Sequence, residues 1–246
     1  MKIAIAGGTG VAGRPTVEAV RNDGHEAVVL SRSRGIDLIS GKGLAAALAG
    51  VDVVIDTANV TTMDAAVATE FFTTATANLI SAGADAGVGH IVLLSIVGID
   101  RMPHDYYAGK LAQEKVLETS SVPWTIQRAT QFHEFAGQIF ARAKFGPLHL
   151  APRARTQPIA ARDVGERLAS LAHGEPLGRA QDIGGPREEA LDAMIKAYAR
   201  ASGHRGWIPS VSVPSAQMKG MREGLALPGT EALLATETFE EWLAAR

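Results

Sequence analysis

Three glycines spaced three apart, in the segment Gly7–Gly13, carry the clearest chemical meaning in this chain. They follow the apolar run Lys2–Ala6, typical of a buried strand, and precede a helical pattern over Arg14–Asn22. A strand, a glycine loop and a helix in this order direct backbone N–H groups and the positive end of a helix dipole at one point. The pattern predicts a site for the pyrophosphate of a dinucleotide. The loop residues assigned to this site are Gly7, Thr9, Gly10, Val11 and Gly13.

The residues after the second predicted strand, Ala27–Leu30, indicate which dinucleotide is bound. Proteins that bind NAD(H) usually place a carboxylate there for the adenosine ribose, whereas this chain has Ser31 and Arg32. An arginine beside a hydroxyl suits a 2′-phosphate through charge-assisted hydrogen bonds, so the sequence predicts NADP(H). The alternative is a surface arginine at a strand end. Asp37 either reaches the adenine or is a carboxylate that holds its own loop.

The elements that would position these residues alternate between strand and helix over the first half of the chain. The predicted strands are Lys2–Ala6, Ala27–Leu30, Val51–Asp56, His90–Ser95 and Trp124–Gln127, and the predicted helices are Arg14–Asn22, Gly43–Ala49, Asp64–Ala86 and His104–Thr119. This order favours the α/β class, with a Rossmann-like, doubly wound parallel sheet and helices on both faces. Ligands of such sheets bind at the carboxyl ends of the strands, so the residues after the third strand are cofactor candidates. They are Thr57, Ala58 and Asn59.

The alternation weakens beyond about residue 130, where prolines become frequent. Residues 1–246 are therefore expected to form a single NAD(P)-binding domain, to which residues from about 130 to 246 contribute a smaller, C-terminal substrate-binding cap. One helix start within this cap is indicated by Asp163 and Glu166, which have the spacing of a capping box.

Composition limits the other classes of function. The 246 residues carry a formal net charge of −2 and contain no cysteine. The lack of cysteine excludes structural disulfides, thiolate catalysis and cysteine-ligated metal sites, and no cluster of other ligands suggests a metal. The near-neutral charge gives no reason to expect a nucleic acid or an anionic membrane as a partner. Glycines interrupt the first apolar run too early for a signal peptide, so the expected location is cytoplasmic.

Several segments, in order along the chain, form a recognisable set. They are the glycine loop, Ser31-Arg32, Ser95–Asp100, Tyr106-x-x-x-Lys110, Pro123–Phe132 and the closing Phe239–Leu243. Together they resemble the NmrA-like, atypical short-chain dehydrogenase/reductases over essentially the whole chain. The resemblance implies a Rossmann fold and an NAD(P) cofactor. It is less specific for the reaction, because this branch contains both reductases and non-catalytic redox sensors.

The resemblance also implies a catalytic group. Typical members of the wider family use a Tyr and a Lys four residues apart on a helix, with a Ser from the preceding strand. The matching residues here are Tyr106, Lys110 and Ser95. Because residues i and i+4 share a helix face, the ammonium is expected to lower the pKa of the phenol and to hold the nicotinamide ribose. Tyr107 is the alternative phenol, since a small rotation of the helix would exchange the two.

Gln131, Phe132 and His133 follow the fifth predicted strand, where a substrate would meet the cofactor. His133 could donate a proton with an unperturbed pKa of about 6.5, or it could be a structural histidine. The expected function is an NADPH-dependent oxidoreductase that transfers hydride to a small carbonyl, enone or quinone-like substrate. The alternative is a non-catalytic NADP(H)-binding redox sensor. Both a monomer and a homodimer are compatible with the sequence.

Overall fold

The computed structural model describes residues 1–146 and 148–246, which divide into two compact units. Unit 1 consists of Met1–Ile96, Pro103–Arg128 and Arg162–Gln181, and unit 2 of Val97–Met102, Ala129–Ala161 and Asp182–Arg246. The cap expected from about residue 130 is therefore not one continuous segment, because Arg162–Gln181 returns to unit 1.

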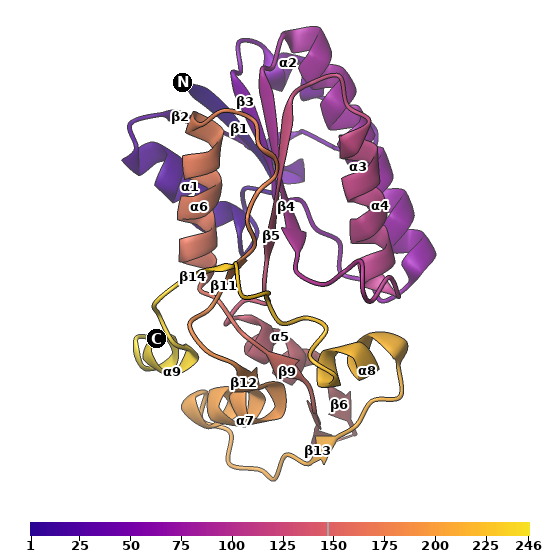
Figure 1. Cartoon of the computed structure of the whole chain (residues 1–246), viewed down its shortest axis with the longest axis vertical. Helices are drawn as coiled ribbons and strands as arrows, with labels where there is room; N and C mark the ends of the chain where they lie inside the picture. Colours follow the sequence, from indigo (N-terminus) through magenta and orange to yellow (C-terminus); the bar gives the residue numbers. More distant parts are fainter. Residues whose placement is uncertain (147) are drawn as a thin grey trace. The chain divides into compact units, whose positions relative to one another are not determined.

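Unit 1 is built on a parallel sheet whose strands run in the order β5, β4, β3, β1, β2 (Figure 1). These strands are β1 (Lys2–Ala6), β2 (Glu26–Leu30), β3 (Val53–Asp56), β4 (His90–Ile96) and β5 (Trp124–Ala129). The short strand β10 (Gly178–Arg179) pairs in parallel with β5. All five strands predicted from the sequence are present, and the last two extend slightly further than expected.

Helices cover both faces of this sheet, as the alternating order requires. In Figure 1, α1 (Gly13–Asn22) and α6 (Ala161–His173) lie on one face, and α3 (Ala65–Ala86) and α4 (Tyr106–Glu118) on the other. Unit 1 also contains two shorter elements, which are α2 (Leu44–Leu48) and the 3-10 turn η1 (Arg32–Arg34). The helix start indicated by the Asp163 capping-box spacing is wrong: α6 begins at Ala161, and Asp163 lies within its first turn.

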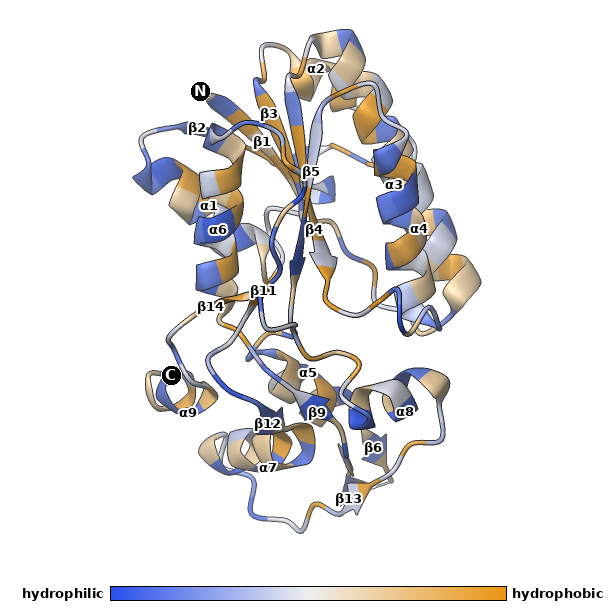
Figure 2. Cartoon of the chain, in the orientation of Figure 1, coloured by the Kyte–Doolittle hydropathy of each residue, from blue (hydrophilic) through white to orange (hydrophobic). Residues whose placement is uncertain are grey.

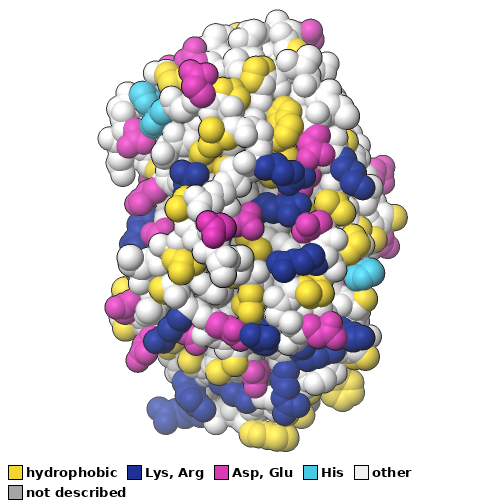
Figure 3. Space-filling model, in the orientation of Figure 1, with side chains coloured by type: hydrophobic (Ala, Val, Ile, Leu, Met, Phe, Trp, Pro, Cys, Tyr) yellow, Lys and Arg dark blue, Asp and Glu magenta, His cyan; other side chains and the backbone are white. Residues whose placement is uncertain are grey.

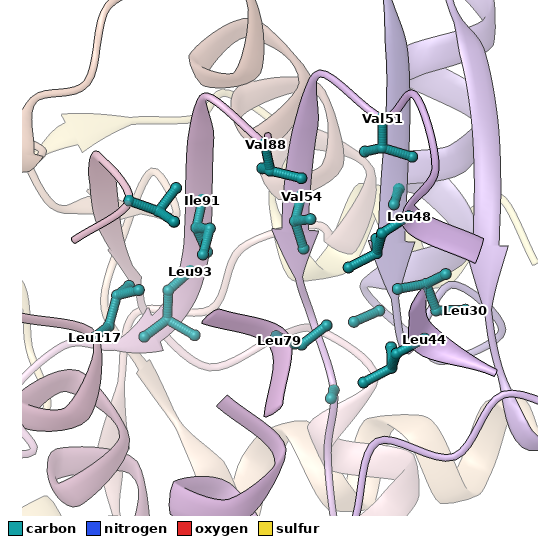
Figure 4. Close-up of a cluster of buried hydrophobic side chains, with 14 of the residues drawn as sticks. Leu30, Leu44, Leu48, Val51, Val54, Leu79, Val88, Ile91, Leu93 and Leu117 are labelled. Carbon is teal, nitrogen blue, oxygen red and sulfur yellow. The ribbon is translucent and has the colours of Figure 1, made fainter. Parts of the chain in front are cut away.

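The core of unit 1 fills the space between the sheet and its helices. Strands β1 and β3 are strongly apolar (Figure 2), and β3 is buried at every residue. Ten side chains of the core cluster are labelled in Figure 4: Leu30, Leu44, Leu48, Val51, Val54, Leu79, Val88, Ile91, Leu93 and Leu117. Burial of each stabilises the fold by about 1.5–3 kcal/mol relative to exposure.

Helices α3 and α4 approach each other closely at Gly109 of α4. A Cβ on this residue would lie 2.6 Å from the backbone carbon of Ala68 in α3, so a glycine is needed there.

The described residues of unit 2 form four helices and several short strand pairs. Its helices are α5 (Phe135–Arg142), α7 (Leu191–Ala201), α8 (Ala216–Arg222) and α9 (Phe239–Ala244). Its strands are β6 (Lys144–Phe145), β7 (Leu148–His149), β8 (Ala151–Pro152), β9 (Arg155–Thr156), β11 (Ile183–Gly184), β12 (Glu189–Ala190), β13 (Ser210–Val211) and β14 (Leu233–Leu234). The pairs are β6 with β7, β8 with β13, β9 with β12 and β11 with β14. Within the described residues of the whole chain, no helix has the length and apolar character needed to cross a membrane.

Candidate cofactor and active site

The glycine loop is closed by backbone contacts that leave no room for side chains. Gly7 has φ +72°, and a Cβ there would lie 2.7 Å from the carbonyl oxygen of Thr57. A Cβ on Gly13 would lie 2.1 Å from the carbonyl oxygen of Gly7. The N–H of Gly10 donates to that same oxygen at 2.8 Å, which closes the turn. Gly7 and Gly13 are therefore required by the turn itself and by the contact between β1 and the start of α1.

The N-terminus of α1 has no side-chain cap, and the Arg14 N–H of its first turn donates to the carbonyl oxygen of Gly10 at 3.1 Å. Ala12, at the N-cap position, makes no side-chain hydrogen bond to the helix, and the first turn contains no acidic residue. The first amides of a helix have no partner within the helix, and the helix dipole adds positive potential at this end. Arg14 braces the loop through a hydrogen bond from Nε to the carbonyl oxygen of Thr9 at 2.9 Å, while Thr9 and Val11 are exposed. The loop thus fits a pyrophosphate bound against backbone amides.

The sheet register brings the other predicted cofactor residues to the same edge. Ala6 at the end of β1 pairs with Leu30 of β2 and with Asp56 of β3. Gly7, Ser31 and Thr57 therefore leave three adjacent strands at one edge of the sheet. The Thr57 hydroxyl donates to the carbonyl oxygen of Ala6 at 2.7 Å, which fixes this strand end. Ala58 is buried beside it, and Asn59 is exposed.

The segment after β2 places Arg32 on the surface and gives Asp37 a local role. Ser31 is extended, and Arg32 opens the exposed turn η1, which ends at Gly35 in the left-handed region. No element had been predicted there. The Asp37 carboxylate accepts hydrogen bonds from the N–H groups of Ile39 at 2.8 Å and Ser40 at 3.4 Å. Of the two alternatives for Asp37, the structure shows the carboxylate that holds its own loop.

Tyr106 lies at this sheet edge, with its hydroxyl against a predicted cofactor residue. Oη donates to Oδ1 of Asn59 at 2.7 Å, and the ring packs edge-to-face on Phe72. Tyr107, the alternative phenol, is buried with 4% of its surface exposed. The expected lowering of the Tyr106 pKa is wrong: burial, with a smaller contribution from Tyr107, raises the pKa of this phenol well above its usual range. Tyr106 therefore stays protonated across the physiological pH range.

The residue before Tyr106 has a strained backbone. Asp105 has φ +52° and ψ −130°, and among the described residues it is the one non-glycine with a positive φ. Such conformations cost about 1–3 kcal/mol and persist where the surrounding structure demands them, often at functional sites. Here the strained residue is the N-cap of α4, directly before Tyr106, the first residue of the helix.

Lys110 does not share the surroundings of the Tyr106 hydroxyl. Its side chain is buried, and Nζ donates to the carbonyl oxygen of Leu94 at 2.8 Å and to Oε1 of Gln113 at 2.5 Å. Nζ also lies 4.7 Å from the centre of the Phe72 ring. In this arrangement Lys110 fastens α4 to the end of β4, which accounts for the missing effect on the Tyr106 phenol.

A buried polar network links Lys110 to a carboxylate on β3. Gln113 Nε2 donates to Oδ2 of Asp56 at 3.0 Å and to Oγ1 of Thr76 at 2.9 Å, so Gln113 bridges the lysine and the aspartate. Burial raises the pKa of Asp56, against the charge of Lys110 and the hydrogen bonds it accepts. Burial also lowers the pKa of Lys110 to about 8, against the nearby carboxylates. Each group is thus pushed towards its neutral form by the same desolvation.

Ser95 belongs to a second buried cluster, centred on Glu114 of α4. Its hydroxyl donates to Oε1 of Glu114 at 2.5 Å. Arg128 forms two hydrogen bonds to the same carboxylate, at 2.9 and 2.8 Å, and Nη1 of Arg179 donates at 3.0 Å. Burial alone would raise the pKa of Glu114, but these hydrogen bonds and the two arginine charges lower it below its usual value. The Ser95 hydroxyl therefore has a partner inside the protein. Through Glu114, the cluster joins α4 to β4, β5 and β10.

The predicted substrate residues lie in unit 2, and most of them are enclosed. His133 is fully buried, with Nε2 at 3.3 Å from the carbonyl oxygen of Glu237 and its ring 5.5 Å from that of Trp242. Gln131 is buried and accepts a hydrogen bond from Thr156 at 2.9 Å. Phe132 is half-buried. His133 thus serves the packing of α9, and Phe132 is the member of the three with the most accessible side chain.

Sequence reasoning missed Asp56, Gln113, Glu114 and Arg128. Two of them had a readable signal. Asp56 ends an apolar run, where a carboxylate can be buried only with partners, and Glu114 follows Lys110 at helical spacing in a helix that must pack on the sheet. Gln113 and Arg128 had no such signal, because their roles depend on which residues of other strands and helices they meet.

Comparison with known proteins identifies the family of the chain. A family model described as NAD(P)H-binding matches residues 35–173, more than half of the chain. No curated protein sequence matches the chain.

Many solved structures share the fold. An NADPH-dependent quinone oxidoreductase from Escherichia coli, solved with NADPH, is 20% identical over 99% of both chains, with a TM-score of 0.74. A triphenylmethane reductase from Citrobacter sp., solved with NADP(H), is 16% identical over 100% of this chain and 99% of that chain, with a TM-score of 0.69. A UDP-N-acetylglucosamine 4-epimerase from Bacillus cereus is 19% identical over 100% and 96%, also with a TM-score of 0.69.

These neighbours share the Rossmann-like architecture but catalyse different reactions, so the fold leaves the reaction open. The family match, by contrast, does identify the class of cofactor. The chain belongs to the NAD(P)H-binding family, as the NmrA-like resemblance of its motifs predicted.

Proposed function

We propose that this chain is an NADPH-dependent reductase that transfers hydride to a small carbonyl, enone or quinone-like substrate. The observation that carries the proposal is the common sheet edge, at which the glycine loop, the exposed Arg32 and the Tyr106–Asn59 pair follow adjacent elements. Bound NADPH would supply the hydride, and the protein's residues would orient the reactants and deliver the proton.

The cofactor-binding part of the proposal rests on the residues of this edge. Gly7–Gly13 and the start of α1 would hold the pyrophosphate, and Ser31 with Arg32 would bind a 2′-phosphate. Thr57, Ala58 and Asn59 would form the floor of the site. Asp37 is left out, because its carboxylate is used by the amides of its own loop.

Tyr106 is the proposed proton donor. Its hydroxyl lies at the sheet edge and stays protonated, so it would donate to an alkoxide that develops on a carbonyl substrate, because such an alkoxide is a stronger base than the phenolate. Asn59 Oδ1 holds the hydroxyl until a substrate oxygen takes its place as the acceptor. Lys110 and Ser95 would act as positioning residues, since both side chains bind groups inside unit 1. Gln131, Phe132 and His133 stay the proposed substrate-binding residues, and Phe132 has the most accessible side chain of the three.

A second function is favoured by a specific observation. All three groups of the expected catalytic set already have protein partners: Tyr106 binds Asn59, Lys110 binds Leu94 and Gln113, and Ser95 binds Glu114. A protein that binds NADP(H) and reports its redox state to a partner needs no free catalytic hydroxyl. The redox sensor is therefore the alternative function.

The preference for NADPH can be tested with a matched pair of arginine variants. Thermal melts with saturating NADPH or NADH should show the larger shift with NADPH for the natural protein. Arg32→Ala should weaken NADPH binding about tenfold or more, the value of a hydrogen-bonded charge pair, and leave NADH unchanged. Arg34→Ala, on the same exposed turn, is the control and should keep the preference. An unchanged NADPH/NADH ratio in Arg32→Ala would contradict the assignment.

Turnover separates the two functions. NADPH consumption should be followed with a panel of quinones, enones and aldehydes. A reductase should oxidise NADPH with at least one class and should lose about 100-fold or more of kcat in Tyr106→Phe, the usual contribution of general acid catalysis. Tight binding of NADPH with no turnover on the whole panel would favour the sensor instead.

A further inference from the structure

Two segments of unit 2 concentrate positive charge that the whole-chain composition conceals. Residues 135–161 and 193–222 together contain nine of the 24 Lys and Arg of the chain and none of its 26 Asp and Glu. The expectation that no anionic membrane is a partner rested on the formal net charge of −2, which averages over this uneven distribution.

Aromatic contacts hold the two segments together. The ring of His149 stacks on that of Phe140, with centroids 4.1 Å apart, and its Nδ1 lies 2.8 Å from the Phe140 carbonyl oxygen. The same ring meets His204, in the loop after α7, at 5.0 Å. The β6–β7 pair and the loop after α7 therefore present one continuous surface.

This surface exposes large apolar side chains. Phe145 on β6 and Trp207 in the loop after α7 are each 75% exposed, and Leu148 on β7 is 38% exposed. Single exposed apolar residues are common, but aromatic residues gathered at one place usually mark a binding surface. Trp124 and Trp242 are half-buried, so Trp207 is the exposed tryptophan of the three.

Exposed basic residues lie on the same two segments as these apolar side chains. Arg142, Lys144, Arg200 and Arg205 are all exposed, and in the described part of the chain no carboxylate lies within ion-pair distance of any of them. Figure 3 shows Lys and Arg side chains gathered over the end of unit 2 where α7 and β13 lie. Two shallow hollows, of roughly 400 and 300 Å³, are lined there by Arg200, His204 and Gly206. We call Arg142, Lys144, Phe145, Arg200, Arg205 and Trp207 the basic–aromatic surface.

We propose that the basic–aromatic surface docks on an anionic phospholipid membrane. Unpaired arginines and lysine complement the phosphate and carboxylate charges of the headgroups, and tryptophan is favoured at the boundary between headgroups and acyl chains. Leu148 beside Phe145 adds aliphatic area, which inserts among acyl chains but offers no face on which a nucleic-acid base can stack. The contact is peripheral, and it does not depend on the reaction that the chain catalyses.

Vesicle co-sedimentation tests the proposal with the full chain. The protein should sediment with vesicles of phosphatidylcholine and phosphatidylserine at low salt, much less at high salt, and not with vesicles of phosphatidylcholine alone. On the anionic vesicles, Trp207 should give a blue shift in fluorescence that Trp207→Phe removes, because the other two tryptophans stay within the protein.

Substitutions identify the residues responsible. Each basic residue near the membrane contributes about 1 kcal/mol, so Arg200→Ala with Arg205→Ala should lower the partition coefficient roughly 25-fold. Phe145→Ser should lower it roughly tenfold or more through the lost apolar insertion. The matched control is Arg21→Ala with Lys115→Ala, which removes the same charge from exposed positions of unit 1 and should change binding less than about twofold.

The outcomes are decisive in both directions. Failure to sediment with anionic vesicles, equal sedimentation with neutral vesicles, or equal weakening by the paired variants of unit 1 and unit 2 would each overturn the proposal. The thermal shift with NADPH, retained in every variant, shows that the fold is intact and separates a failure here from a failure of the proposed function.

Discussion

Burial decides what Lys110 can do, whatever its spacing from Tyr106. The sequence placed the two residues on one helix face, and four-residue spacing does bring them to the same side of α4. However, the lysine turns into the layer between the helix and the sheet, where it binds Leu94 and Gln113. Desolvation then acts on its charge more strongly than the attraction of Asp56 does, and lowers its pKa to about 8.

This lowered pKa predicts a pH dependence of stability. The unfolded chain binds the Lys110 proton up to a pH of about 10.5 and the folded chain only to about 8, so folding releases a proton between these values. Stability should therefore rise by up to about 3 kcal/mol as the pH increases through this window. Lys110→Met, which has no such proton, should show a flatter curve. Urea unfolding of both proteins at a series of pH values measures the difference, and parallel curves would refute the buried charge.

Measurements of stability and of kcat can distinguish a structural role of the Ser95 hydroxyl from a catalytic one. Its hydrogen bond to Glu114 stabilises a buried carboxylate that has two arginine partners. Ser95→Ala should lower the free energy of unfolding by about 1–3 kcal/mol, the cost of removing a hydrogen bond to a buried charged group. It should leave kcat within about threefold, since a catalytic hydroxyl would be worth about 100-fold or more. A large loss of kcat with unchanged stability would return Ser95 to the catalytic group.

At the scale of elements, two variants of the glycine loop distinguish its role in packing from its role in cofactor binding. Gly13→Ala places a Cβ 2.1 Å from the Gly7 carbonyl oxygen, so α1 must move away from β1. It should destabilise the fold by about 1–3 kcal/mol and abolish the thermal shift with NADPH. At Gly10 the nearest atom is 3.2 Å from a Cβ, so Gly10→Ala should fold nearly normally. It should still weaken NADPH binding, because the methyl group stands where the pyrophosphate approaches. A full NADPH shift in Gly10→Ala would contradict the assigned path of the cofactor.

The elements of unit 1 could be predicted because their signals are local. A short, mostly apolar run defines each central strand, and the glycine spacing defines the turn after β1, so β1 to β5 agree with the sequence to within a few residues. The polar networks could not be predicted in this way. Asp56 and Gln113 lie 57 positions apart, and their contact depends on how α4 packs against β3. The short strands of unit 2 also lack a signal, since two residues cannot show an alternating pattern.

At the scale of the whole molecule, the two units interleave along the chain. A boundary near residue 130 assigns α6 and β10 to the cap, but both belong to unit 1. The reason is visible in their contacts: a Cβ on Gly165 of α6 would lie 2.7 Å from the backbone of Pro15, and Arg179 of β10 binds Glu114. Close packing of α6 on α1 therefore covers a face of the sheet that the first 128 residues cannot cover alone.

This interleaving predicts the outcome of truncation. A fragment of residues 1–128 lacks α6 and β10, which exposes the buried face of α1 and removes Arg179 from the Glu114 carboxylate. It should bind hydrophobic dyes and melt without a cooperative transition, because the apolar face of α1 loses its cover and total stability is only about 5–15 kcal/mol. Joining residues 162–181 to this fragment through a flexible linker should restore a cooperative melt and a shift with NADPH. If the fragment of residues 1–128 melts as cooperatively as the full chain, the cap boundary expected from the sequence is the correct one, and α6 is dispensable for unit 1.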